Sequence, residues 1–174
     1  MADQLKIRQI QVAHNAIEDR LLIRIATQNS EEIGVFITRR FLRELWPFLV
    51  TILLDHLSNA TPVLASNQPK NSPSGASFDE DFSNENPKFP LGEKPLLATE
   101  VNIELAGQNA VKITFREAQQ RNISLNLDSD LMHALCSMLR STSEQAGWDF
   151  QLDYVKQKPT AAIQSAPAIR RMLH

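Results

Sequence analysis

The sequence predicts an α+β protein made of two strand-strand-strand-helix halves with antiparallel sheets, joined by a disordered linker. Three observations predict this fold class. Apolar and polar residues alternate in short runs on both sides of the middle of the chain, which is typical of strands with one buried face. After each set of runs, apolar residues recur at the i, i+3, i+4, i+7 spacing of a buried helix face. Between the two sets, Asn, Ser, Pro and acidic residues replace the apolar pattern.

The first half, residues 1–58, begins with three alternating runs. We expect a strand at 7–13, followed by a hairpin whose apolar positions are Ile23, Ile25, Ile33, Val35 and Ile37. A helix is expected to start after Thr38, because a threonine hydroxyl accepts a hydrogen bond from a free backbone N–H group at a helix start.

The helix of the first half is apolar on nearly all sides as far as Leu57. Such a helix must be covered on all sides, whereas three small strands cover only one face. We therefore expect it to pack on the other half or on a second copy of the protein, which would make a homodimer. Pro47 removes a backbone donor and predicts a kink or interruption near Trp46, with two short helices meeting at Pro47 as the alternative.

The linker, residues 59–95, is predicted to be disordered, most clearly over 60–88. A segment of this composition buries too little apolar surface to offset the entropy that it loses on ordering. Regular structure is expected to resume near 89–91. Aromatic and acidic residues alternate at 78–82, which fits either a docking peptide or plain solvated linker.

The second half, residues 96–153, follows the plan of the first at an offset of 90 residues. A strand is expected over 97–105, followed by a hairpin whose apolar positions are Ile113, Phe115, Ile123, Leu125 and Leu127. Asp128 takes the place of Thr38 ahead of the second helix. The agreement of cap, hairpin and helix face at one offset favours internal duplication. The alternative is that any two α+β segments can be slid until their apolar residues coincide.

The net charge of −2 is distributed unevenly along the chain. The first half is neutral, the linker carries −2 and the second half −4. Residues 154–174 hold four basic and no acidic side chains. We expect a basic, flexible tail that either folds back onto the acidic half or reaches an acidic partner.

The sequence predicts a cytoplasmic protein that does not enter a membrane. The most apolar stretch, 41–57, carries Arg43, Glu44 and Asp55, whereas a bilayer span needs about 20 nearly uncharged residues. The first twenty residues mix charged with apolar positions, unlike a signal peptide. The single cysteine, Cys136, has no disulfide partner within the chain.

Catalytic and cofactor motifs are missing, so we expect no enzyme and no catalytic, cofactor-binding or metal site. The five glycines form no phosphate-binding loop, and the four histidines lack the spacing of a shared metal site. No G-x-S-x-G elbow is present. Helix capping accounts for Asp128 and Asp130 better than acid–base chemistry does. A site around His133 and Cys136 is the remaining catalytic alternative.

Two groups of residues are candidates for binding another protein. Arg39, Arg40 and Arg43 lie at a helix start, where cations oppose the helix dipole, which suggests an acidic partner surface. The C-terminal group combines apolar and basic residues, as in a short helix that lies in a partner's groove, with a frayed terminus as the alternative. Its residues are Ile169, Arg170, Arg171, Met172 and Leu173. We therefore predict a non-enzymatic protein-binding, adaptor or assembly protein.

The alternative function is single-stranded nucleic-acid binding. Tandem strand-rich repeats, each closed by a helix, resemble in topology the Whirly and PUR-type single-strand binders, although no family motif is matched. Such proteins follow phosphates with a basic groove and stack bases on aromatic rings. The candidate cations, which could equally form a solvated outer face of each sheet, are Arg20, Arg24, Arg39, Arg40, Arg43, Lys112, Arg116 and Arg121.

Overall fold

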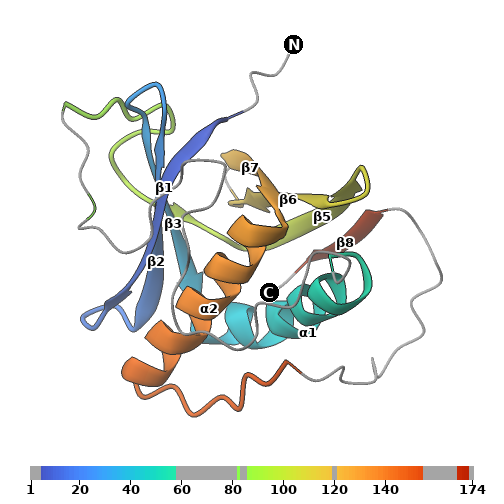
Figure 1. Ribbon diagram of the computed structural model, residues 1–174. Coiled ribbons are helices and arrows are strands. Elements are labelled where there is room, and N and C mark those ends of the chain that lie inside the picture. Colours follow the sequence, from blue (N-terminus) through green and yellow to red (C-terminus); the bar gives the residue numbers. More distant parts are fainter. Residues whose placement is uncertain (1–4, 58–81, 83–85, 119–120, 155–167, 173–174) are drawn as a thin grey trace.

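The computed structural model describes residues 5–57, 82, 86–118, 121–154 and 168–172, the last of these segments by its backbone alone. These residues form a mixed α+β structure with two four-stranded sheets and two helices (Figure 1). The predicted α+β class is confirmed. No helix in the described part of the chain is long and apolar enough to cross a membrane.

The first sheet has the strand order β1-β2-β3-β4. Its strands are β1 (Ile7–Asn15), β2 (Arg20–Thr27), β3 (Glu32–Thr38) and β4 (Leu96–Leu97). The first three pair antiparallel in sequence order, and the two residues of β4 pair parallel with β3. Alternate residues of β2 and β3 are buried, as the period of two predicts.

The second sheet has the strand order β7-β6-β5-β8 and is antiparallel throughout. Its strands are β5 (Glu100–Ala106), β6 (Ala110–Arg116), β7 (Asn122–Asp128) and β8 (Ala168–Met172). The C-terminal strand β8 therefore lies at one edge, beside β5.

Each half contains one helix, α1 (Arg39–Asp55) and α2 (Ser129–Gln145). The Thr38 side chain accepts a hydrogen bond from the Phe41 N–H at 3.2 Å, and the Asp128 carboxylate accepts one from the Leu131 N–H at 2.9 Å. Both predicted helix starts are confirmed. The alternative of two short helices meeting at Pro47 is wrong, because α1 continues through Pro47 as one helix. Buried residues on both sides of the proline hold the helix together despite the missing donor.

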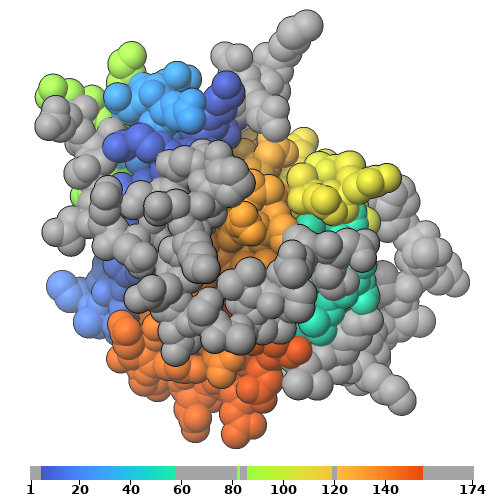
Figure 2. Space-filling view, in the orientation of Figure 1, coloured from blue at the N-terminus to red at the C-terminus, as the bar shows by residue number. Residues whose placement is uncertain are grey.

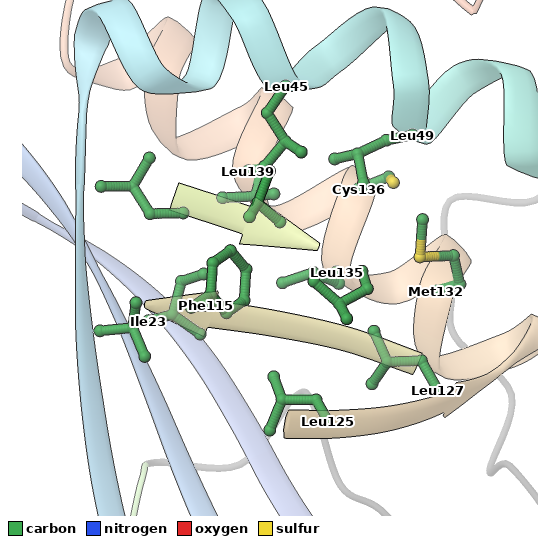
Figure 3. Packing of buried hydrophobic residues seen from close by; sticks show 14 of the residues in the cluster. Ile23, Leu45, Leu49, Phe115, Leu125, Leu127, Met132, Leu135, Cys136 and Leu139 are labelled. Atoms are coloured by element: carbon green, nitrogen blue, oxygen red, sulfur yellow. The ribbon is translucent and has the colours of Figure 1, made fainter. Parts of the chain in front are cut away.

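One hydrophobic core joins the two halves. Leu45 and Leu49 of α1 point toward α2, and Phe115 of the second sheet lies beside Ile23 of the first (Figure 3). Helix α2 also packs against β1 and β2, and the Thr142 hydroxyl reaches the Val12 carbonyl oxygen at 3.4 Å. The exposed positions of α1 are all polar: Arg39, Arg40, Arg43, Thr51 and Asp55. The apolar sides of α1 are thus covered within a single chain, so this helix gives no reason to invoke a second copy.

The strand predicted at 97–105 is divided between the two sheets, which corrects the expectation of three strands in each half. Leu96 is buried against the first sheet, and the Ala98 N–H donates to the Phe36 carbonyl oxygen at 3.0 Å. The Thr99 N–H then donates to the carbonyl oxygen of Arg116 in the second sheet, at 2.9 Å. The chain crosses from one sheet to the other at this point, because backbone groups at both sheet edges are open to pairing.

The linker predicted over 59–95 is shorter than expected at its C-terminal end. Residues 58–81 and 83–85 lie outside the described part of the chain, whereas 86–95 follow a defined course. The Lys88 N–H donates to the Ser30 carbonyl oxygen at 2.9 Å, and its carbonyl accepts from the Glu32 N–H at 2.8 Å. Backbone pairing with the edge of β3 needs no apolar pattern, so composition could not predict it.

Arg121 connects residues 86–95 to the second half through hydrogen bonds. Its guanidinium donates to the carbonyl oxygens of Leu91 and Lys94, at 3.2 and 3.0 Å, and pairs with Glu117 at 2.6 Å. The hydrogen bond from Arg121, together with one from the Leu97 N–H and the charge of Arg121, holds the pKa of Glu117 below its ordinary value.

Gly34 in β3 is required by its contact with Pro95. A β-carbon at this position would lie 3.0 Å from two atoms of the Pro95 ring. We expect Gly34→Ala to lower the free energy of unfolding by about 1–3 kcal/mol, because the rigid ring and the sheet must move apart. Urea unfolding measures the change. Adding Pro95→Ala should restore part of the loss, and a Gly34→Ala protein as stable as the wild type would contradict the close contact.

Candidate partner-binding surfaces

Of the candidate catalytic pair, Cys136 is buried in the core and His133 is half-buried. Cys136 is fully enclosed, and burial raises the pKa of its thiol, which keeps the thiol protonated. Desolvation lowers the pKa of His133, and the nearby charge of Asp130 only partly opposes this. Among the described residues, no group of three or more His, Cys, Asp or Glu side chains could hold a metal ion. This pair therefore offers neither an accessible nor an ionised nucleophile.

The three predicted arginines at the start of α1 have different surroundings. The Arg39 guanidinium bonds to Asp19 at 2.9 Å and lies over the Trp148 ring, 5.3 Å from its centroid. Arg40 pairs with Glu44 one turn along the helix, at 3.1 Å. Arg43 is exposed and has no acidic partner among the described residues. Arg39 thus has a structural role, whereas Arg40 and Arg43 present positive charge to solvent.

Asp19 joins three parts of the chain that are distant in sequence. It lies in the β1–β2 turn, and its carboxylate accepts a 2.7 Å hydrogen bond from the indole N–H of Trp148, which follows α2. Nε2 of His14 is 3.6 Å from the same carboxylate, and its ring meets the Trp148 ring edge-on. Figure 2 shows the β1–β2 turn (blue) against the end of α2 and the residues after it (orange). We call Asp19, Arg39 and Trp148 the Asp19 cluster; no motif in the sequence indicated it.

The Asp19 cluster predicts an acid-dependent stability. The hydrogen bond from Trp148, followed by the bond and charge of Arg39, holds the pKa of Asp19 below its ordinary value of 3.8. The stabilisation is therefore complete above the ordinary pKa and is lost as the pH falls through the lower pKa of the folded state. The Tm of Asp19→Asn should lie below that of the wild type near neutral pH, and the difference should shrink below about pH 4. A difference that stays constant down to about pH 2 would contradict this.

The chain after α2 covers Trp46 of α1. The indole N–H of Trp46 donates to the Asp153 carbonyl oxygen at 3.1 Å, and the Tyr154 ring lies 5.5 Å from the Trp46 ring. The Arg140 guanidinium lies 5.5 Å from the centroid of the Tyr154 ring. Burial raises the pKa of Tyr154 to about 12. Trp46 and Trp148 are both buried, so neither can stack on a base.

The outer face of the first sheet combines arginines with aromatic rings. Arg20 lies over the Phe36 ring, 5.9 Å from its centroid, and Arg24 over the Phe82 ring at 3.9 Å. Arg24 is also bonded to Glu32 at 2.9 Å. Arg20, Arg24 and Phe36 thus line a face on which a nucleic acid could bind, in competition with these contacts.

The C-terminal candidate residues form a strand, so the prediction of a short helix there is wrong. Strand β8 pairs antiparallel with β5, from Glu100 opposite Met172 to Glu104 opposite Ala168. Without β8, this edge of β5 would present unpaired backbone N–H and C=O groups, and the local sequence of the C-terminal residues does not reveal such an edge. Leu173 lies outside the described residues. The two predicted groups are on different elements, one at the start of α1 and one at the edge of the second sheet.

Comparison with family models, with curated proteins and with solved structures finds nothing significantly similar to this chain. Two surfaces are therefore the basis for a functional proposal. One is the exposed pair Arg40 and Arg43 on α1, and the other is the edge of β5 that pairs with β8.

Proposed function

We propose that this protein is a non-enzymatic protein-binding adaptor or assembly factor that acts in the cytoplasm. The observation that supports it best is the position of β8. The edge of the second sheet binds an extended segment through backbone pairing, and strand addition of this kind is a common way for proteins to bind peptides.

The exposed arginines of α1 provide a second contact in this proposal. Arg40 and Arg43 extend from the first turns of the helix, where Glu44 compensates only one of them. Charges at the rim of an interface mainly accelerate association with a surface of opposite charge. We therefore infer that the partner presents an acidic surface to this end of α1.

Affinity purification from an extract of the source cells tests the proposal. We expect a protein partner that survives nuclease treatment and is depleted when Arg40→Glu and Arg43→Glu are combined. Arg116→Glu, an exposed arginine on the second sheet, is the matched control and should retain the partner. Recovery of no specific protein by the wild type would refute the proposal.

Single-stranded nucleic-acid binding is the second candidate, supported by Arg20, Arg24 and Phe36 on the outer face of the first sheet. Its affinity for a mixed-sequence single strand should fall steeply as the salt concentration rises, because phosphate binding releases counterions. If no binding is detected at low salt, this candidate is eliminated. Nucleic acid that co-purifies and is lost on nuclease treatment would favour it over the adaptor.

We also propose that the two halves arose by internal duplication. Arg20 pairs with Thr38, and Ala110 pairs with Asp128 in the corresponding position of the second sheet, 90 residues further along in both strands. The two helices are displaced by the same 90 residues. An experimental structure in which residues 20–55 and 110–145 fail to superpose would argue against duplication.

A further inference from the structure

We propose that the free side of β5 is a docking site for an extended strand of a protein partner, and that β8 is a replaceable occupant of this site. We call this side the β5 edge: the main-chain groups of Glu100–Ala106 that point away from β6. The inference rests on the proposed protein-binding function and specifies the chemistry of the partner.

The described residues of β8 cover Glu100–Glu104 of the β5 edge. Strand β6, by comparison, pairs with β5 along its whole length, from Glu100 to Ala106. The next residue, Leu105, is 54% exposed and is one of three large hydrophobic side chains exposed in the described part of the chain. A strand two residues longer than β8 would pair with the end of β5 and cover Leu105.

The register of β8 includes one mismatch. Ile169 lies opposite Ile103, but Arg171 lies opposite Val101. Val101 and Ile103 are both buried on the core side of the sheet. Residues directly opposite each other in antiparallel strands share a face, so the position opposite Val101 lies on the apolar side of the sheet, where a charge would lose hydration. An apolar residue would suit the position opposite Val101 better.

The other face of β5 favours a basic strand. Glu100, Asn102 and Glu104 alternate with the buried residues, and Arg170 is in register with Asn102, between the positions opposite the two glutamates. The amide of Asn102 donates to the Glu104 carboxylate at 2.8 Å, and Lys112 of β6 lies 3.6 Å from the same carboxylate, so a basic residue already pairs with this face of β5. The preferred partner strand is therefore apolar opposite Val101, Ile103 and Leu105, and basic opposite Asn102.

The covalent connection keeps β8 in place in spite of this imperfect match. Residues 155–167 link β8 to Tyr154, which is anchored on Trp46. Of the elements of the structure, β5 is the one against which β8 packs extensively. A covalent connection raises the local concentration of the tethered segment, to the order of millimolar where the connection is short. A partner strand must therefore bind more tightly than β8 to replace it, which sets a threshold for partner selection.

The experiment opens the β5 edge in the full-length protein. Ile169→Pro combined with Arg170→Pro disrupts β8, because successive N–H groups point to opposite sides of a strand and one of them must face β5. Ala161→Pro combined with Ala162→Pro, in the connection, is the matched control. The probe is a fluorescent peptide of residues 166–174, and fluorescence anisotropy measures its binding.

We expect the peptide to bind the 169/170 variant with a Kd at least about 10-fold lower than for the wild type or the control, because the competing strand is absent. A peptide carrying Arg171→Ile should bind more tightly still, and a scrambled peptide should not bind. Equal binding to all three proteins, or binding to none, would overturn the proposal. So would a wild-type dimer that the 169/170 variant converts to a monomer, since the occupant would then be a second copy.

These outcomes are independent of the test of the proposed function. If peptide binding is as expected but no cellular protein is recovered by affinity purification, the adaptor function fails while the β5 edge remains a strand-binding site. If a partner is recovered but the peptide does not bind, the β5 edge is refuted and the adaptor function stands.

Discussion

Replacing Trp148 by alanine should lower the free energy of unfolding by about 3–5 kcal/mol. The indole is 1% exposed and contacts the rings of His14 and Phe150. Its N–H also donates the 2.7 Å hydrogen bond to Asp19. Alanine leaves a cavity and removes a donor to a carboxylate, so both terms act in the same direction. Denaturant unfolding at neutral pH measures the effect.

Two further variants separate packing from hydrogen bonding at Trp148. Trp148→Phe retains most of the ring and loses the N–H group, so we expect a smaller loss of about 1–3 kcal/mol. Ile17→Ala, at a 97% exposed position in the same β1–β2 turn, should change stability by less than about 0.5 kcal/mol. A Trp148→Ala protein within about 1 kcal/mol of the wild type would show that the residues after α2 are not anchored in this way.

Phe115→Ala should destabilise the protein by a similar amount, about 3–5 kcal/mol, although it lies in the other sheet. The side chain is 1% exposed, and its ring lies 6.4 Å from that of Phe41 in α1. Because the halves share one core, we expect a single transition that shifts as a whole. Leu105→Ala, at a half-exposed position in the same sheet, is the control and should have a small effect.

Two spectroscopic signals test this shared core. Tryptophan fluorescence reports on Trp46 and Trp148, and far-UV circular dichroism reports on the whole backbone. The two unfolding curves should coincide in the wild type and in Phe115→Ala. Two separate transitions, of which the substitution moves only one, would mean that the halves unfold independently.

Side-chain periodicity is the part of the fold that the sequence could reveal. Alternation placed the hairpins around Ile23 and Ile113, and the helix starts followed from Thr38 and Asp128. These features are local, because each depends on residues a few positions apart.

Backbone pairing at sheet edges could not be predicted in the same way. Lys88 and Leu96 join the first sheet, and β8 joins the second, through main-chain groups that every sequence carries. The basic and apolar composition of 169–173 suits a helix and a strand equally well. The available edge of β5 determines the outcome, and composition does not reveal such an edge.

The candidate surfaces could be predicted only in part from the sequence. Arg40 and Arg43 are exposed, as a binding role requires, whereas Arg39 is held by a carboxylate 20 residues earlier in the chain. The bond between Asp19 and Trp148 spans 129 residues and depends on tertiary packing alone. A contact of this kind cannot be predicted from local residue patterns.

Hydrogen exchange of the full-length protein tests most directly whether β8 is a replaceable strand on the β5 edge. The amides of β8 should exchange more slowly than those of an unstructured peptide and faster than those of β6, because β8 opens locally while the core stays folded. Exchange of β8 as slow as that of β6 would make it a permanent part of the sheet, and exchange as fast as an unstructured peptide would mean that β8 does not occupy the β5 edge.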